Sequence, residues 1–354
     1  MATETFFSKP ALTPERTEFY ARLGERSTAP LWEVLGKLVS PEPHPDTRPV
    51  LWRYAELRPL LMEAGRLLTA EEAERRVLVL ENPGLAGRSQ ATGSLYAGLQ
   101  LILPGEIARC HRHVASALRF IIEGRGAYTT VEGERTGMSP GDFILTPSWT
   151  YHDHGNPGDE PVVWLDGLDV PMVNLFDTSF ASHPPPADAP RPVEAGASHA
   201  RYGANMLPVD YVPSSSSSPL FVYPYARSRE VLDRMARTGP VHRCHGVKTR
   251  FANPVTGGYP MPTIAAFMQL LPAGFSGERY RATDATVYAA LEGRGTTTIG
   301  ETRYEWGPRD IFVVPSWAPV AHQASSESVL FSMSDRAAQQ ALGLWREEAP
   351  LRSA

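Results

Sequence analysis

Four of the ten histidines lie in two short segments, with His111 and His113 forming one His-x-His pattern and His152 and His154 another. Imidazole nitrogens bind iron, zinc and other transition metals, and they also move protons near neutral pH. Alternate residues of a β-strand point to the same face, so each pair would present two rings together. Histidines that only fill a core or a surface can show the same spacing. The pattern therefore suggests a metal site, and the residues around the histidines are needed to choose between the two interpretations.

The residues around the histidines follow a longer pattern. Gly105 lies six residues before His111. The later block contains Gly141, Pro147, Trp149, His152 and Asn156 in that order. These blocks resemble the paired motifs of the cupin superfamily, in which the first motif supplies His-x-His and the second supplies another histidine. A closer similarity, to gentisate 1,2-dioxygenase and its salicylate-cleaving relatives, is carried by residues 31–35, 81–84, 96–100, 111–124 and 149–156.

This resemblance implies a ligand set and a cofactor. His111, His113 and His152 match the metal ligands, and His154 lies beside the metal without binding it. Ala117 stands where many cupins have a glutamate, which leaves three neutral imidazoles. The family implies one Fe(II) per chain, with zinc as the main rival, because three histidines and a water also form a catalytic zinc site. A 2-hydroxybenzoate that chelates through carboxylate and phenolate oxygens would neutralise the metal's double charge.

Neighbouring residues predict a substrate pocket beside the metal. Arg119 follows His113 by six residues and would share its strand face, where a buried arginine needs an anion such as a substrate carboxylate. Tyr96, Gly98 and Gln100 also share one face, with Gln100 placed to hydrogen-bond the carboxylate and Gly98 leaving room for a ring. His154 is predicted to donate a hydrogen bond or to act as an acid or base.

Two further pocket residues are implied with an alternative for each. Arg75 resembles a substrate-side arginine, but its neighbour Arg76 leaves the register open, and Arg75 could equally stabilise the end of a helix. Asp166 could orient His154 or meet a 5-hydroxyl of the substrate, or it could end a surface strand.

The elements that position these residues are predicted to be short strands and turns. From Tyr96 onward no segment shows a long 3.6-residue apolar period, and strands are expected at 99–103, 118–122, 127–131, 143–146 and 162–165. Residues 123–126 recur at 292–295 and residues 142–149 recur at 310–317. Two copies of one small β-domain predict an all-β-dominated bicupin, with two antiparallel β-barrel or jelly-roll domains and an N-terminal helical arm.

The predicted domain boundaries follow from composition and from this repeat. They are an arm over 1–95, a metal-binding cupin over 96–180, a linker over 181–225 that holds Pro184–Pro186 and Ser214–Ser218, and a degenerate second cupin over 226–345. Within the arm, Thr13 and Thr69 are expected to cap helices, and residues 77–80 to form a strand. Aligning the repeats places Tyr280, Ala282 and Val320 opposite the three ligands and His322 opposite His154. The second barrel is therefore predicted to hold no metal.

Composition excludes several classes of protein. The net charge of −5 and the absence of a basic cluster argue against nucleic-acid or membrane partners. The first residues show no basic segment followed by an apolar run, and no apolar run in the sequence reaches about 20 residues, so a cytoplasmic protein is expected. Cys110 and Cys244 are expected to stay reduced thiols.

The function expected from the resemblance is ring cleavage of an aromatic 2-hydroxy acid by O₂ in a homotetramer. The leading substrate is gentisate, cleaved between its carboxyl-bearing and hydroxyl-bearing carbons to maleylpyruvate. Salicylate, a 5-substituted salicylate and 1-hydroxy-2-naphthoate are the alternative substrates. A non-oxidative zinc cupin, either an isomerase or a binding protein, is the more distant alternative.

Overall fold

The computed structural model describes residues 10–183, 190–204, 206–213 and 215–351. The leader expectation at residues 1–8, the proline run 184–186 and Ser214 lie outside the described residues. Contacts divide the chain into two compact units, residues 1–44 and 45–354. The described part of the smaller unit forms α1 (Pro14–Gly24), capped by Thr13 as predicted, and α2 (Leu31–Leu38).

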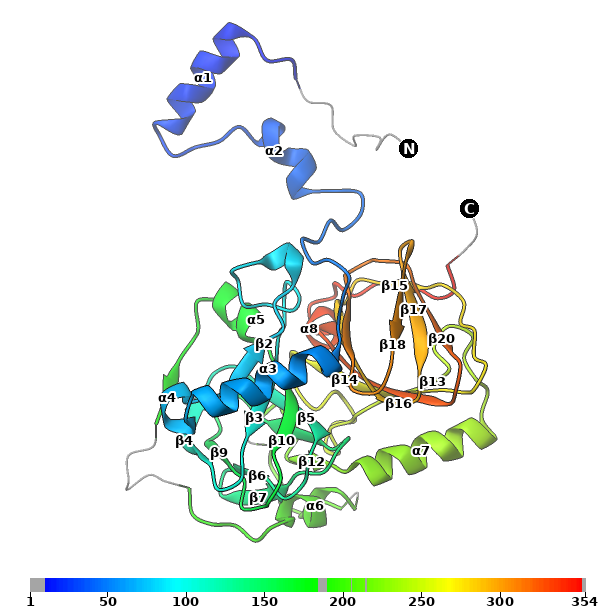
Figure 1. The fold of residues 1–354 in the computed structure, drawn as a ribbon. Coiled ribbons are helices and arrows are strands. Elements are labelled where there is room, and N and C mark those ends of the chain that lie inside the picture. The colour runs from blue at the N-terminus through cyan, green and yellow to red at the C-terminus, as the bar shows by residue number, and fades with distance from the viewer. Residues whose placement is uncertain (1–9, 184–189, 205, 214, 352–354) are drawn as a thin grey trace. The chain divides into compact units, whose positions relative to one another are not determined.

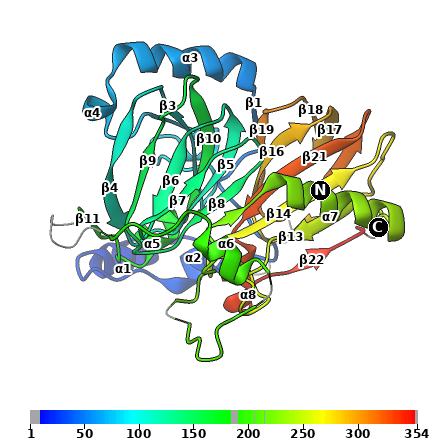
Figure 2. The ribbon, with the colours of Figure 1, turned by 90° about the horizontal axis from the view of Figure 1, so that it is seen from below.

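The first barrel of the larger unit consists of two antiparallel sheets (Figures 1 and 2). One sheet has the strand order β12-β8-β5-β10-β3-β2, and the other has the order β11-β4-β9-β6-β7. The strands are β2 (Val77–Val79), β3 (Tyr96–Ile102), β4 (Ile107–His113), β5 (Ala117–Glu123), β6 (Tyr128–Val131), β7 (Glu134–Gly137), β8 (Phe143–Thr146), β9 (His152–Gly155), β10 (Val162–Leu168), β11 (Ala181–Ser182) and β12 (Val222–Tyr223). Each strand predicted from the sequence in this region overlaps one of these strands. The ligand-bearing β4 and β9 were not among the predicted strand ranges, although the His-x-His pairs were expected to lie on strands.

The second barrel repeats this plan. Its larger sheet has the order β1-β19-β16-β21-β14-β13, and smaller sheets have the orders β18-β17-β20 and β15-β22. The strands are β1 (Val50–Trp52), β13 (Val247–Arg250), β14 (Ala265–Leu271), β15 (Arg281–Ala282), β16 (Thr286–Glu292), β17 (Gly295–Ile299), β18 (Thr302–Trp306), β19 (Ile311–Val314), β20 (Val320–Ala324), β21 (Ser328–Ser334) and β22 (Glu347–Glu348).

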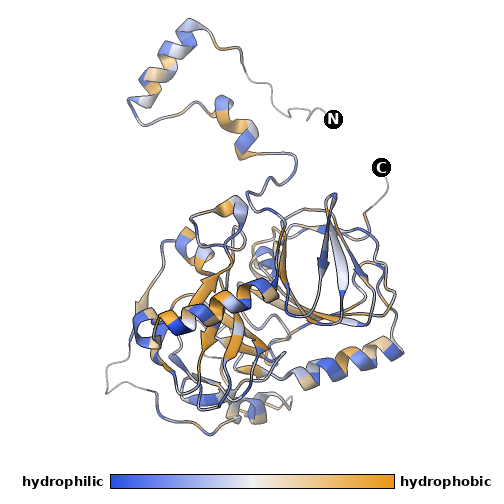
Figure 3. Cartoon of the chain, viewed as in Figure 1, coloured by the Kyte–Doolittle hydropathy of each residue, from blue (hydrophilic) through white to orange (hydrophobic). Residues whose placement is uncertain are grey.

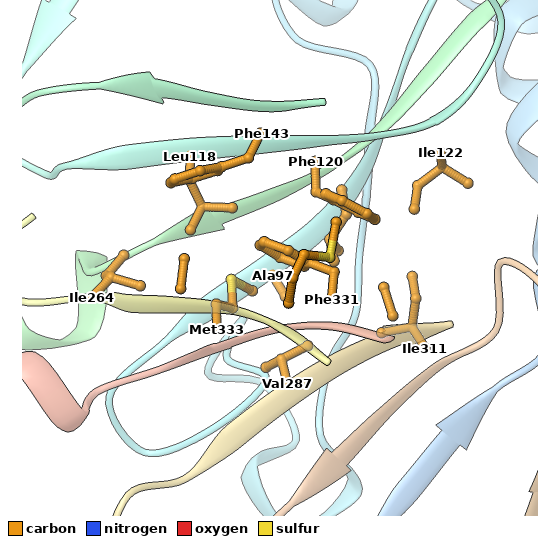
Figure 4. Close-up of a cluster of buried hydrophobic side chains, with 14 of the residues drawn as sticks. Ala97, Leu118, Phe120, Ile122, Phe143, Ile264, Val287, Ile311, Phe331 and Met333 are labelled. Carbon is orange, nitrogen blue, oxygen red and sulfur yellow. The ribbon is translucent and has the colours of Figure 1, made fainter. Parts of the chain in front are cut away.

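The main hydrophobic core lies between the two larger sheets (Figure 4). Phe120 of β5 stacks on Phe331 of β21 with ring centroids 4.1 Å apart. Gly167 of β10 allows this close approach, because a Cβ atom there would lie 2.1 Å from Sδ of Met333. Alternate residues point the other way, into the barrels, where Ile121 and Trp164 form a smaller apolar cluster. Figure 3 shows hydrophobic residues concentrated on the strands of both barrels.

The repeat is longer than the sequence indicated, because each copy begins with a strand and a helix that reach the other barrel. β1 precedes the first barrel but pairs with β19 of the second, and β12 precedes the second barrel but pairs with β8 of the first. The helices α3 (Tyr54–Leu67) and α7 (Tyr225–Thr238) follow these strands. Residues 181–225, predicted as a linker, thus contribute β11 and β12 to the first barrel.

Side chains at the start of the two helices make reciprocal contacts. The backbone N–H of Tyr54 donates to Asp310 Oδ1 of the second barrel at 3.0 Å, and the Tyr54 hydroxyl donates to Glu123 of the first barrel at 3.0 Å. In the other copy, the N–H of Tyr225 donates to Asp142 Oδ1 at 2.9 Å and its hydroxyl donates to Glu292. Each helix therefore bridges both barrels.

The remaining helices are short: α4 (Ala70–Ala73), η1 (Pro83–Leu85), α5 (Val170–Leu175), α6 (Ala197–Tyr202) and α8 (Arg336–Ala341). The predicted capping box is present, with Thr69 and Glu72 exchanging hydrogen bonds at the start of α4. The expectation of no long helical period after Tyr96 is wrong for α7, which has 14 residues. Leu232 is the fully buried residue of α7, and Tyr225 and Ala236 pack partly buried against the core, so few apolar positions mark this helix in the sequence. Among the described residues, no helix is long and apolar enough to cross a bilayer.

Candidate active site

The three histidines predicted as ligands lie on two neighbouring strands. His111 of β4 pairs directly with His152 of β9, and His113 lies two residues further along β4. Their ring centroids are 4.2 Å apart for His111 and His152 and 4.9 Å apart for His113 and His152. One nitrogen of each ring lies within 4.8 Å of the others, close enough for the three to share a single ion. Alternation along β4 and the cross-strand register together produce this cluster.

Hydrogen bonds fix the orientation of two of these rings. His113 Nδ1 lies 2.7 Å from the Ala115 carbonyl, and His152 Nδ1 lies 3.0 Å from the Thr150 carbonyl. Donation from Nδ1 leaves Nε2 as the free ligand atom, and the buried Nε2 of His152 has no partner among the described residues. Burial lowers the pKa of all three rings, in His111 to about 3, so the imidazoles are neutral. Neutral imidazole is the metal-binding form, and the donor set fits a divalent transition metal.

A cavity of about 360 Å³ opens beside the three histidines. Its walls include six of the seven other residues predicted for the site: Arg75, Tyr96, Gln100, Arg119, His154 and Asp166. Gly98 is absent from the cavity wall. A Cβ atom at Gly98 would lie 2.5 Å from Val77 Cγ1 and 2.8 Å from the Tyr96 hydroxyl, so this glycine makes room for the chain's own side chains. Val77 and Tyr96 themselves line the cavity, so the expectation that Gly98 leaves space for a substrate ring stays a prediction.

Arg119 is a buried cation that faces the cavity. It lies opposite Asp166 in the ladder between β5 and β10, with Nε 3.7 Å from Asp166 Oδ1. One terminal nitrogen of Arg119 donates to Thr146 Oγ1, and the buried Nε has no hydrogen-bond partner among the described residues. Burial lowers the pKa of Arg119 to about 10 and raises the pKa of Asp166 to about 6. Arg119 thus stays charged at neutral pH and retains capacity for an anion.

The structure resolves the choice between the two neighbouring arginines. Arg75 reaches the cavity, where its Nη2 donates to the Arg109 carbonyl at 2.8 Å and lies 2.5 Å from His111 Nδ1. Arg76 points away and forms a buried ion pair with Glu106 at 2.8 Å. Arg75 is the one that can meet a ligand beside the histidines.

His154 points one free nitrogen into the cavity. Its Nδ1 lies 2.9 Å from Thr129 Oγ1, while its buried Nε2 has no partner among the described residues. The ring packs against Trp164 with centroids 5.4 Å apart. Burial lowers the pKa of His154 well below its usual value, so the ring is neutral and can donate or accept one hydrogen bond.

Comparisons with known proteins agree with this geometry. Residues 98–169 match the family model of the cupin domain. A gentisate 1,2-dioxygenase of Aquipseudomonas alcaligenes is 56% identical over 97% of this chain and 99% of its own length. A 5-aminosalicylate 1,2-dioxygenase of Comamonas is 37% identical over 92% of this chain and 88% of its own. The crystal structure of salicylate 1,2-dioxygenase from Pseudoaminobacter salicylatoxidans with gentisate has a TM-score of 0.89 at 32% identity, covering 96% of this chain and 95% of that one.

The chain belongs to the gentisate 1,2-dioxygenase family. It is a ring-cleaving dioxygenase, and the bicupin fold and the family predicted from the sequence are confirmed.

The second barrel of this gentisate 1,2-dioxygenase family member has other residues at the ligand positions. Tyr280 pairs with Val320, as His111 pairs with His152 in the first barrel. His322 Nδ1 lies 2.9 Å from Thr297 Oγ1, which repeats the contact of His154 with Thr129, but its Nε2 meets the Tyr280 hydroxyl at 3.2 Å. Within the part of the chain that the structure describes, only the first barrel gathers a possible metal-binding group.

Sequence reasoning missed part of the cavity wall of this family member. The additional residues are Val77, Arg88, Ser89, Gln90, Ala117, Leu168, Val170, Pro171 and Asn174. Leu168 could have been found, because it shares the strand face of Asp166. Residues 88–90 lie outside helices and strands, so no periodicity marks them.

Proposed function

We propose that this dioxygenase is Fe(II)-dependent and converts gentisate and O₂ to maleylpyruvate, cleaving the ring between the carboxyl-bearing and hydroxyl-bearing carbons. The observation that carries the proposal is a neutral three-imidazole cluster in the wall of a cavity that also holds a buried arginine. Relatives at 56%, 35% and 36% identity over more than nine tenths of this chain are themselves gentisate 1,2-dioxygenases, which supports this substrate.

His111, His113 and His152 would hold one Fe(II) per chain. Bound ferrous iron supplies the chemistry that lets O₂ react with an aromatic ring, and it offers positive charge to a chelating hydroxy acid. Because the three imidazoles are neutral, they leave that charge uncompensated for an anionic substrate.

The chain's own residues would bind and orient the substrate. Arg119 of β5 is a charge-assisted hydrogen-bond donor for the carboxylate. Gln100 of β3, in the wall of the same cavity, would give the carboxylate a second hydrogen bond. Arg75 adds positive charge next to His111. Tyr96 and Asp166 line the same cavity and are available to a 5-hydroxyl. His154 would hold or transfer the proton of the 2-hydroxyl through Nε2.

Other 2-hydroxy acids are the second candidate substrates. Relatives at 37% and 33% identity are a 5-aminosalicylate 1,2-dioxygenase and a 1-hydroxy-2-naphthoate dioxygenase. Substituent discrimination of about 1–3 kcal/mol is enough to separate such rings, and small changes of the cavity wall produce it.

Oxygen uptake tests the proposal. Protein loaded anaerobically with Fe(II) is given gentisate, salicylate, 5-aminosalicylate or 1-hydroxy-2-naphthoate in an oxygen electrode, with zinc-loaded protein as the control. We expect the highest kcat/KM with gentisate, one O₂ consumed per maleylpyruvate formed, and no uptake with zinc. Higher kcat/KM on another ring would change the substrate, and no uptake with any of them would refute the oxidative function. A homotetramer is proposed from the same family resemblance, and light scattering of the purified protein tests the assembly. The cytoplasmic location stays a proposal from the sequence.

A further inference from the structure

Arg112 lies between two of the proposed ligands and is not part of the cavity. It separates His111 from His113 on β4, so its side chain points to the opposite face of the strand. The guanidinium carbon lies 4.4 Å from the ring centroid of Trp149 and 4.4 Å from that of Tyr151. Arg112 is therefore held between two aromatic rings, an arrangement in which each ring face attracts the cation.

These two rings belong to the segment that leads into the third ligand. Tyr151 immediately precedes His152, and Trp149 holds a left-handed backbone conformation with φ of +62°. The N–H of Trp149 donates to the His113 carbonyl at 2.8 Å. On its other side, Arg112 Nε donates to Ser182 Oγ of β11 at 3.0 Å. Arg112 thus joins the strand with two ligands, the turn before the third, and an outer strand.

The strand pairing between β4 and β9 constrains the positions of the ligands only weakly. Its register shifts between Ala108 and His111, and the pair of His111 with His152 is the single ladder pair beyond the shift. An irregular ladder fixes the separation of two strands less firmly than a continuous one, because fewer paired hydrogen bonds resist sliding. The contacts of Arg112 lie on the side where the ladder ends.

The second barrel contains a simpler version of the same contact. Arg281 lies over Trp317 at 4.4 Å, Trp317 has φ of +61°, and its N–H donates to the Ala282 carbonyl at 2.7 Å. Arg281 also donates to Glu348 at 2.9 Å. Pro319 stands at the position of Tyr151. In the second barrel, which lacks the three histidines, this turn is held by one aromatic ring and an ion pair. The first barrel, which has the histidines, adds a second ring over its arginine.

We propose that Arg112 is a positioning residue for the metal: its double stacking holds His111 and His113 at binding distance from His152, and metal retention depends on it. The inference rests on the proposed metal site and adds a residue that touches neither metal nor substrate.

The test compares Arg112→Met with the matched variant Arg281→Met in the full-length protein. Each variant and the unmodified protein is loaded with Fe(II) under anaerobic conditions, and the rate of iron transfer to an excess of a ferrous chelator is measured together with Tm. We expect Arg112→Met to lose iron about 10- to 100-fold faster, matching the 10- to 100-fold loss of metal affinity that follows removal of groups that orient metal ligands. Arg281→Met should lower Tm at least as much and release iron at the unmodified rate.

Three results would overturn the proposal. Equal iron release from Arg112→Met and the unmodified protein would refute the positioning role while leaving the proposed function intact. Equal acceleration in both variants would assign the effect to general destabilisation. Failure of the unmodified protein to bind stoichiometric iron would refute the metal site itself, and the positioning role with it. If Arg112→Met does not fold, Tyr151→Leu removes one ring and keeps the arginine, and it must also accelerate iron release.

Discussion

At the scale of single residues, the site contains buried nitrogen atoms that have no hydrogen-bond partner among the described residues. Arg119 is 3% exposed, and its Nε lacks a hydrogen-bond partner among the described residues, although Asp166 lies nearby. Asp166 partly neutralises Arg119 without bonding to it closely, which leaves the guanidinium available to a carboxylate. The free Nε2 of His154 and of His152 face the same region. Such atoms are costly to bury alone, so a bound metal and substrate explain them.

The first prediction concerns Arg119. In Arg119→Met the substrate carboxylate loses a charge-assisted hydrogen bond of about 1.5–3 kcal/mol, so we expect the KM for gentisate to rise about 10- to 100-fold. Iron content should stay at the unmodified level, because Arg119 does not contact the three ligands. Steady-state oxygen uptake and metal analysis check both points. Iron loss with an unchanged KM would contradict the assigned role.

The second prediction concerns the support of His154. Thr129→Val keeps the shape of the side chain but removes the hydroxyl 2.9 Å from His154 Nδ1. Losing a bond worth about 1 kcal/mol should lower kcat about fivefold while KM and iron content are kept. Thr129→Ser should restore kcat, and Thr297→Val, the same change in the second barrel, should not affect it. Impaired kcat in Thr297→Val would show that the effect is not local to His154.

At the scale of elements, an aspartate at the end of each barrel binds a hydroxyl from the segment that leads into the other barrel. Asp169, before α5, accepts hydrogen bonds from the N–H of Ser116 at 2.8 Å and from Thr263 at 2.5 Å. Asp335, before α8, accepts them from the N–H of Ala285 at 3.0 Å and from Ser94 at 2.7 Å. In both cases the hydroxyl comes from the segment that leads into the other barrel. These aspartates tie neighbouring elements at equivalent places in the repeat.

The third prediction follows from the burial of Asp335, which raises its pKa to about 6. A raised carboxyl pKa means that the folded state holds the proton more tightly than the unfolded chain. The free energy of unfolding should therefore fall as pH rises from about 4 to about 6, by up to about 3 kcal/mol from this group. Asp335→Asn should remove this part of the pH dependence, as urea unfolding of the metal-free protein at several pH values would show. Identical pH profiles would contradict it.

At the scale of the whole molecule, the two barrels share one core. The larger sheets pack face to face, and the exchanged strands β1 and β12 extend each sheet with chain from the other repeat. The second barrel therefore contributes to the core that supports the first barrel, and among the described residues it gathers no group of metal ligands. At the three ligand positions it has Tyr280, Ala282 and Val320 in place of the histidines, and the packing between the larger sheets is present all the same.

The fourth prediction tests that packing. In Gly167→Ala the new methyl group would collide with Met333 across the sheets, and overpacking of this kind costs about 1–3 kcal/mol of stability. Met333→Ala in the same chain should recover part of the loss, because it removes the colliding atoms. Gly137→Ala, with open space around the glycine, is the control and should have little effect. Thermal unfolding measures all three, and a loss in Gly167→Ala that Met333→Ala does not reduce would contradict the packing argument.

The sequence by itself determined the features that depend on local periodicity and on repeated motifs. Strand alternation predicted that His111 and His113 share a face, and the repeat predicted the loss of ligands at Tyr280 and Val320. Local capping chemistry predicted the helix starts after Thr13 and Thr69. Each of these depends on residues close in the chain or on two copies of one pattern.

Only the tertiary structure decided which residues from distant segments meet. It assigned Arg75 to the cavity and Arg76 to Glu106, filled the space over Gly98 with Val77 and Tyr96, and exchanged β1 and β12 between barrels. The physical reason is that side-chain packing and strand pairing across large sequence separations depend on the shape of the assembled sheets, which alternation within one strand does not specify.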